Sequence, residues 1–270
     1  MCLIVFAYKQ HPEYNLILVA NRDEQYERPT QSLHIWDSPT GIIAGRDSLQ
    51  SGTWLGIAHN GHFSAITNHR NGLHIRSTSR SRGLLTTEFL NSSVSAQHYA
   101  DEISQTSVPY NGFNLIVADS SGLYHASNVT KEYQYLRSGI YGLSNALLDT
   151  DWPKTRQQKQ RLKDALQAHN PNPQTLIEMM ADPQRYPDET LPDTHVGIEI
   201  ERALSSSFIQ LESYGTRATT VVMQDYHGRT RIIEQNYTAA GKAELIEYEL
   251  QIEPFGGITG QTEPATESAG

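Results

Sequence analysis

The chain begins with MCLIVFAY (1–8), and a second apolar run, LILVA, follows at 16–20. The first run is continuous and β-prone, which is typical of a strand buried on both faces. The two runs are joined by KQHPEYN (9–15), whose centre is residue 12. In a hairpin about that centre, paired residue numbers sum to about 24, so Cys2 is predicted to face residue 22, give or take two.

Cys2 is the only cysteine of the chain and stands directly behind Met1. Methionine aminopeptidase removes Met1 when the second residue is small, and the mature chain would then begin with Cys2. An α-amine titrates near ~7.7–8.0 and a thiol near ~8.5, so the amine can act as a general base beside a strong nucleophile. The alternative interpretation is a small residue at the start of a strand.

The segment opposite Cys2 is NRDE (21–24). A buried ammonium needs a carboxylate partner, and a developing thiolate is favoured by a nearby cation. Asp23 and Arg22 could supply both. The alternative interpretation is an ordinary charged turn after a strand.

The rest of the chain predicts antiparallel hairpins interrupted by grouped helices. Hairpins are expected over 53–58 with 63–67, 113–119 with 123–127, 132–136 with 139–144 and 216–225 with 229–237, with a last strand over 243–252. Helices are expected over 81–92, 95–106, 152–170, 172–182 and 195–206. This order favours one α+β domain over 1–255, followed by a Gly/Thr/Glu/Pro-rich tail over 256–270 that is expected to be disordered.

Composition excludes several classes of protein. With 37% apolar and 19% charged residues in 270, the chain is expected to be globular. Its net charge of −9 disfavours binding to nucleic acid or to an anionic membrane. No apolar run reaches the roughly 18 residues of a transmembrane helix, and a lone cysteine is consistent with a reducing cytoplasm. The composition does not indicate an oligomeric state.

The chain resembles the NRDE family, whose eukaryotic members are named for transport and Golgi organisation. The resemblance begins with MCLIVFAY (1–8) and NRDE (21–24). It continues through GRDSLQSGTWLGI (45–57), TNHR (67–70), YNGFNLIVAD (110–119), YGLSNALLDTDWPK (141–154) and YGTRATTVV (214–222). These motifs occur in the family's order and cover most of the chain up to about residue 250.

The family is similar to N-terminal nucleophile hydrolases of the choloylglycine hydrolase and penicillin V acylase type. This resemblance implies a four-layer αββα sandwich of antiparallel sheets. It also implies six site residues. Cys2 resembles the nucleophile, with its own amine as the base, and Arg22 and Asp23 resemble the supporting pair. Asn68 resembles an oxyanion-hole residue, Asn145 resembles the residue that holds the amine or the substrate, and Arg217 resembles the late arginine of that site.

Two functions are compatible with this resemblance. The first is an amidohydrolase that forms a Cys2 thioester with a small acylated substrate and needs neither a cofactor nor a metal. The second is a non-catalytic protein that binds or traffics haem or a lipid in the same cleft. His59, His62, His69 and His74 lack a further ligand at a recognised spacing, so the sequence does not predict a metal site.

Overall fold

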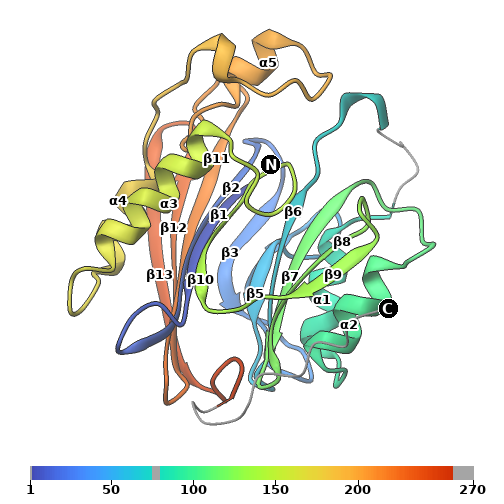
Figure 1. Cartoon of the computed structure of the whole chain (residues 1–270), viewed down its shortest axis with the longest axis vertical. Helices are drawn as coiled ribbons and strands as arrows, with labels where there is room; N and C mark the ends of the chain where they lie inside the picture. Colours follow the sequence, from blue (N-terminus) through green and yellow to red (C-terminus); the bar gives the residue numbers. More distant parts are fainter. Residues whose placement is uncertain (1, 75–79, 258–270) are drawn as a thin grey trace.

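The computed structural model describes residues 2–74 and 80–257 and consists of two antiparallel sheets packed face to face (Figure 1). The six-stranded sheet has the order β10–β1–β2–β11–β12–β13. Its strands are β1 (Cys2–Tyr8), β2 (Tyr14–Gln25), β10 (Gly139–Leu143), β11 (Tyr214–Asp225), β12 (Arg229–Thr238) and β13 (Gly241–Gln251).

The seven-stranded sheet has the order β3–β4–β5–β6–β7–β8–β9, so each strand pairs with its neighbour in sequence. Its strands are β3 (Thr30–Ile35), β4 (Ile43–Asp47), β5 (Leu55–Ile57), β6 (Phe63–Asn68), β7 (Phe113–Asp119), β8 (Gly122–Ser127) and β9 (Glu132–Tyr135).

Helices cover the outer face of each sheet. In chain order, the helices of the described residues are η1 (Gly72–His74), α1 (Gly83–Asn91), α2 (Ala96–Ser104), α3 (Pro153–Ala165), α4 (Pro173–Met180), η2 (Asp188–Thr190) and α5 (Ile198–Ala203). Helices α1 and α2 pack on the seven-stranded sheet, and α3 and α4 pack on the six-stranded sheet (Figure 1). The arrangement is the four-layer αββα sandwich that the sequence predicts.

Strand β1 shows why its apolar run is continuous. Side chains alternate between the two faces of a strand. Ile4 and Phe6 enter the core between the two sheets. Leu3 and Val5 pack beneath α3 and α4 instead. Because one face of β1 meets the other sheet and the opposite face meets α3 and α4, both faces need apolar residues.

The predicted hairpins are confirmed with one exception. Residues 132–136 and 139–144 do not form a hairpin: β9 pairs with β8, whereas β10 pairs with β1 in the other sheet. The chain therefore crosses between sheets in the three residues between β9 and β10. Strands β3 and β4 are additional elements that the sequence patterns did not predict.

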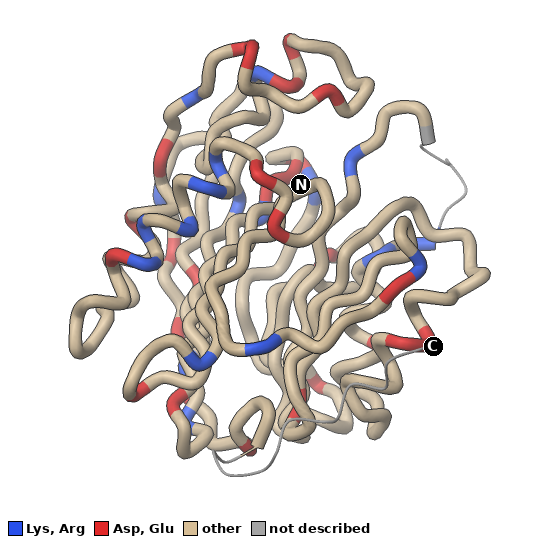
Figure 2. Tube along the Cα trace, in the orientation of Figure 1, with Lys and Arg blue, Asp and Glu red and all other residues tan. Residues whose placement is uncertain are grey.

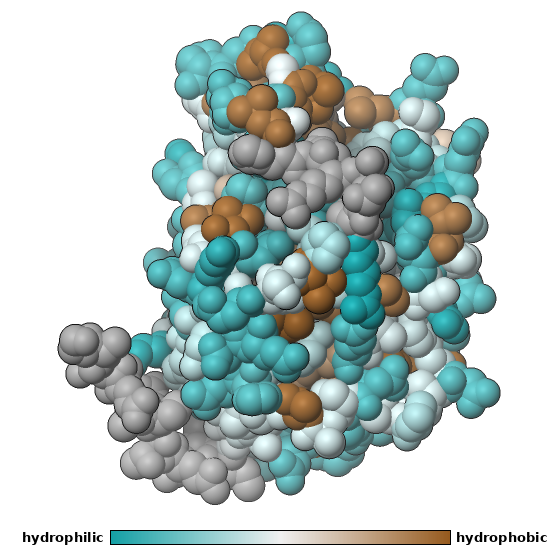
Figure 3. Space-filling view, turned by 90° about the vertical axis from the view of Figure 1, so that its right-hand side faces the viewer, coloured by the Kyte–Doolittle hydropathy of each residue, from teal (hydrophilic) through white to brown (hydrophobic). Residues whose placement is uncertain are grey.

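Charged residues lie mainly in loops, helices and strand ends, and along strands β12 and β13 at one edge of the six-stranded sheet (Figure 2). The face drawn in Figure 3 carries separate apolar patches between polar residues, one of them at the top, where α5 lies. Ile198 and Ile200 of α5 are about half exposed.

Within the described residues, no helix is long and apolar enough to cross a membrane. Of the predicted tail over 256–270, residues 258–270 lie outside the described residues.

Candidate active site

The β1–β2 hairpin places Cys2 opposite Arg22, as predicted from the centre of the connecting loop. Cys2 is half-buried at the end of an interior strand. A cavity of about 270 Å³ opens beside it. Four of the six predicted site residues line this cavity, which we call the Cys2 pocket: Cys2, Arg22, Asp23 and Asn68. Its other lining residues are Glu24, Arg28, Asp47, Gln50, Gly52, Thr53, Trp54, Ile66, Arg80, Ser81, Arg82 and Gly83.

Arg22 is held by an aromatic ring and two carboxylates. Its guanidinium lies 4.3 Å from the Trp54 ring centroid. Its Nη2 atom lies 3.8 Å from Asp47 and 3.9 Å from Glu24. The arginine is 5% exposed, and among residues 2–74 and 80–257 its Nη1 atom has no hydrogen-bond partner. A cation is thus fixed opposite the thiol with one donor nitrogen still available.

Gly45 makes the position of Trp54 sterically possible. A Cβ atom on this glycine would lie 2.4 Å from the Trp54 ring, which is closer than real Cβ contacts. The GRDSLQSG segment (45–52) also carries Asp47, which accepts a 2.6 Å bond from Arg28 and bonds from two backbone N–H groups. This segment of the family motif therefore shapes one wall of the Cys2 pocket.

Asp23 is buried on the other face of β2. Its carboxylate accepts a 2.7 Å hydrogen bond from the Thr216 hydroxyl, and its main-chain oxygen accepts one from Tyr214 at 3.0 Å. Burial raises the pKa of Asp23, and the charge of Lys154 opposes that shift. Burial also raises the pKa of Cys2. The charge of Asp23 acts in the same direction on that thiol, whereas the charge of Arg22 lowers its pKa.

The two predicted asparagines lie together at the end of β6. Asn145 donates from Nδ2 to the main-chain oxygen of Asn68 at 2.8 Å, and its own main-chain oxygen accepts from the Arg70 N–H at 2.7 Å. Asn145 is 1% exposed, and its side-chain oxygen Oδ1 lacks a hydrogen-bond partner in the described part of the chain. Ser144 next to it donates to the Cys2 carbonyl at 3.4 Å.

Arg217 lies on β11 beside Arg22 and Asp23, but its side chain holds the backbone of β2 instead of the pocket. As far as the structure describes the chain, it does not line the Cys2 pocket. It stands at an irregularity of β11, where Thr216 pairs with Asp23 and Ala218 pairs with Arg22. Its Nη1 atom donates to the main-chain oxygens of Gln25 and Arg28, at 2.8 and 3.2 Å. The geometry indicates that Arg217 holds the end of β2, and a direct role stays a prediction.

Two basic residues near the thiol were missed by the sequence analysis. Lys154 is 4% exposed, and its ammonium donates to the Leu204 carbonyl at 2.8 Å. Burial lowers its pKa to about 8, while the Asp23 carboxylate opposes the shift. Arg82 lines the Cys2 pocket just before α1. Lys154 belongs to the quoted motif YGLSNALLDTDWPK, which could have indicated it, whereas Arg82 has no comparable signal.

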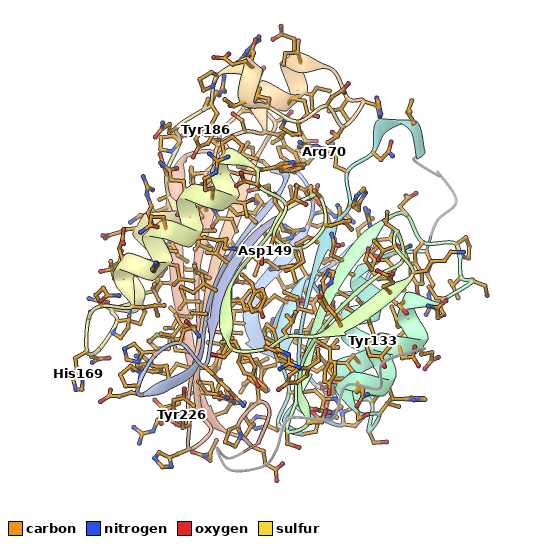
Figure 4. All side chains as sticks on the ribbon, viewed as in Figure 1. Arg70, Tyr133, Asp149, His169, Tyr186 and Tyr226 are labelled. Atoms are coloured by element: carbon orange, nitrogen blue, oxygen red, sulfur yellow. The ribbon has the colours of Figure 1, made fainter. Side chains whose placement is uncertain are left out.

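A second and larger cavity adjoins the Cys2 pocket. Its volume is about 720 Å³, and it shares Asn68 and Arg82 with the Cys2 pocket. Arg70 also lines it, just beyond β6 and below the α5 segment in Figure 4. This arginine forms a buried ion pair with Glu201 of α5 and lies over the Trp152 ring. We call this cavity the larger pocket.

Metal binding has little support from the described residues. Outside residues 75–79 and 258–270, and apart from Met1, no three His, Cys, Asp or Glu side chains are grouped so that they could hold a metal ion. His62, one of the four histidines considered above, stacks on Phe89 and bonds its main-chain oxygen at 3.0 Å. These contacts indicate that His62 stabilises the packing of α1 on the sheet.

Comparisons with known proteins place the chain among relatives of similar length. The model of the family described as Transport and Golgi organisation 2 matches residues 1–239. The Transport and Golgi organization protein 2 homolog of Bos taurus is 34% identical over 257 residues, which cover 87% of this chain and 93% of the relative. Transport and Golgi organization protein 2 of Drosophila melanogaster is 26% identical over 262 residues, covering 88% and 93%.

Two solved structures have related shapes. One is the Caenorhabditis elegans ortholog of N-acylethanolamine-hydrolyzing acid amidase, with a TM-score of 0.48 and 12% identity, covering 82% of this chain and 92% of the other. The second is a conjugated bile acid hydrolase from Clostridium perfringens, with a TM-score of 0.43 and 10% identity, covering 97% and 99%.

Proposed function

The chain belongs to the Transport and Golgi organisation 2 family, and from the geometry around its single thiol we propose that it is an N-terminal cysteine hydrolase. Its substrate would be a small molecule with an amide or another acyl bond. The observation that carries the proposal is the position of Cys2. The thiol lies at the end of an interior strand, opposite Arg22, in a pocket that Asp23 and Asn68 also line.

The proposed reaction requires removal of Met1. The α-amine of Cys2 then takes the thiol proton, and the thiolate sulfur attacks the acyl carbon. The C–N bond of the amide breaks, the leaving amine takes the proton from the α-ammonium, and a thioester remains on Cys2. Water, activated by the same amine, hydrolyses the thioester and restores the thiol.

Each neighbouring residue has a proposed part in this reaction. The Asn68 side chain is a donor for the oxyanion, a kind of contact that is typically worth ~3–4 kcal/mol. The buried Oδ1 atom of Asn145 is the acceptor for the α-amine of Cys2. Arg22 supports the thiolate. Asp23, whose side chain lies on the opposite face of β2, supports the ammonium.

A second candidate function is that of a carrier without catalytic turnover. The larger pocket favours it, because three exposed apolar residues lie on its wall, Leu73, Val108 and Val129. Such a wall suits an apolar ligand such as a lipid or haem. A carrier would use the same cleft but would need no thiol.

The experiment that separates the two functions replaces Cys2. Cys2→Ala still permits removal of Met1 but lacks the nucleophile, whereas Cys2→Leu keeps Met1. Intact mass spectrometry checks the first residue and detects an acyl adduct on the wild type. A hydrolase loses turnover of an acyl panel of amides, esters and thioesters in both variants, by several powers of ten. If the wild type hydrolyses none of them and Cys2→Ala binds lipid or haem as tightly, the hydrolase proposal is wrong.

A further inference from the structure

Arg82 lies where the Cys2 pocket and the larger pocket meet, because it lines both cavities. It immediately precedes α1, which begins at Gly83. Its Nη1 atom donates to the main-chain oxygen of Gly112 at 3.0 Å, which fixes one side of the guanidinium. A molecule that extends from Cys2 into the larger pocket would pass this side chain.

The other arginines of the Cys2 pocket have carboxylate partners. Arg28 lies 2.6 Å from Asp47, Arg80 is paired with Glu88, and Arg22 lies within 4 Å of two carboxylates. Arg82 has no ion pair within residues 2–74 and 80–257. It is therefore the arginine of this pocket that has no carboxylate within 4 Å among the described residues.

Burial of Arg82 also disfavours its charged form, because the guanidinium loses contact with water. Burial lowers the pKa of this guanidinium, and the Glu24 carboxylate and the thiolate form of Cys2 oppose the shift. Arg82 is thus close enough to the Cys2 sulfur to interact with the thiolate. A partly desolvated guanidinium without a carboxylate partner gains most from an anionic oxygen group, which its planar fork can bind with two hydrogen bonds.

We propose that Arg82 is a specificity-determining residue that binds an anionic oxygen group of the substrate, such as a carboxylate, within a few atoms of the carbon that Cys2 attacks. The proposal rests on the proposed function of Cys2 for its biological meaning. The remainder of the substrate extends into the larger pocket, where apolar side chains accompany the polar ones. The ligand class is accordingly an acyl compound that carries a negative charge beside the reacting bond.

The test uses two alkylating reagents of nearly the same shape. Iodoacetate is anionic and iodoacetamide is neutral, and each forms an S–C bond with the thiolate while iodide leaves. The chain has one cysteine, so mass spectrometry of the whole protein follows a single reaction. The ratio of the two rate constants cancels the fraction of thiolate, and its change between variants therefore reports recognition of the anion.

The variant is Arg82→Gln, compared with Arg82→Lys and with Arg46→Gln. Arg46 lies over the Trp36 ring, 4.6 Å from its centroid, and lines neither the Cys2 pocket nor the larger pocket as the structure describes them, so its replacement removes the same charge outside both cavities. We expect Arg82→Gln to lower the iodoacetate-to-iodoacetamide ratio about tenfold, the usual scale of one hydrogen bond to a charged group. Arg82→Lys should retain part of the ratio, and Arg46→Gln should change it less than about twofold.

A measurement on the wild type does not depend on how the variants fold. At equal concentration, butyrate should slow the iodoacetamide reaction more than butyramide does. Equal protection by both, or the same loss of ratio in Arg82→Gln and Arg46→Gln, overturns the assignment of Arg82. Alkylation requires only the Cys2 thiolate and the alkyl iodide, without any acyl transfer. A protein that hydrolyses no acyl bond can therefore still pass this test, and an active hydrolase can fail it.

Discussion

The side-chain amide of Asn145 donates a 2.8 Å hydrogen bond to the main-chain oxygen of Asn68, across 77 residues of sequence. This bond joins the segment after β10 to the end of β6, and these strands belong to different sheets. Asn145, two residues after β10, thereby fixes the end of β6, whose last residue, Asn68, lines the Cys2 pocket.

We predict that Asn145→Ala lowers both stability and the reactivity of Cys2. The lost bond leaves a carbonyl group without its donor, at a cost of about 1–3 kcal/mol in the free energy of unfolding. Urea denaturation and the iodoacetamide rate measure the two effects. Asn60→Ala is the control, because Asn60 makes two similar bonds, to Leu90 and Ser92, outside the Cys2 pocket. Loss of Cys2 reactivity in both variants contradicts the prediction.

Gly45→Ala should act on the pocket through Trp54. The new methyl group displaces the indole ring, which destabilises the protein by about 1–3 kcal/mol and removes the surface on which Arg22 lies. In a Trp54→Leu background the methyl group has room, so the same change should cost much less. Denaturation of the four proteins in this cycle gives the coupling energy. If the two substitutions change the free energy of unfolding additively, the methyl group is not accommodated by movement of Trp54, and the prediction is wrong.

Asp23→Asn and Arg22→Gln should shift the pKa of Cys2 in opposite directions. The Asp23 carboxylate raises that pKa, so its removal stabilises the thiolate and moves the alkylation profile to lower pH. The Arg22 cation lowers that pKa, so its removal moves the profile to higher pH. The measurement is the iodoacetamide rate against pH. Shifts of the same sign in both variants contradict the assigned charges.

The Arg70–Glu201 pair should be strongly coupled. Arg70 also donates to Thr194 at 2.8 Å, and Glu201 accepts from the Thr194 N–H at 2.8 Å. Either Arg70→Met or Glu201→Gln alone leaves a buried polar partner and should cost about 3–5 kcal/mol. The double variant should cost less than the sum of the two. Thermal unfolding of all four proteins decides this, and strict additivity would exclude the coupling.

His125 should make the protein sensitive to mild acid. Burial lowers its pKa from 6.5 to about 4, and its ring contacts Asn114 at 3.2 Å. Between these pH values the unfolded chain binds the proton and the folded one does not. The contribution of His125 to the free energy of unfolding is thus fully present above pH 6.5. It falls by up to about 3 kcal/mol as the pH is lowered toward 4. His125→Gln should flatten that part of the curve of unfolding free energy against pH, whereas replacement of the exposed His98 should leave its slope intact.

Strand pairing was predictable where two apolar runs flank a recognisable turn, and it was missed for β3 and β4. The β1–β2 register followed from two apolar runs and the centre of their loop, because a short loop fixes the pairing. The same reasoning failed at β9 and β10. A separation of three residues resembles a hairpin, and nothing local distinguishes a turn from a crossing between sheets.

The site was predictable in part for a similar reason. Cys2 and Arg22 are brought together by one hairpin, whereas Lys154 and Arg82 approach the thiol only through tertiary packing. A lysine or arginine in a sequence usually indicates a solvated surface, since such residues are seldom buried. Burial identified Lys154, which its motif alone could also have indicated, and pocket lining identified Arg82.

The direction of β1 has a practical consequence for the design of fusion proteins. Its first residue, Cys2, lies in the pocket, while the hydroxyl of its last residue, Tyr8, bonds the carbonyl of Phe255 near the other end of the described chain. A purification tag or fluorescent reporter joined ahead of Cys2 would leave the molecule through its cleft and occupy it. Imaging, pull-down and activity measurements with such fusions would report on a blocked protein, and labels should be attached after Phe255 instead.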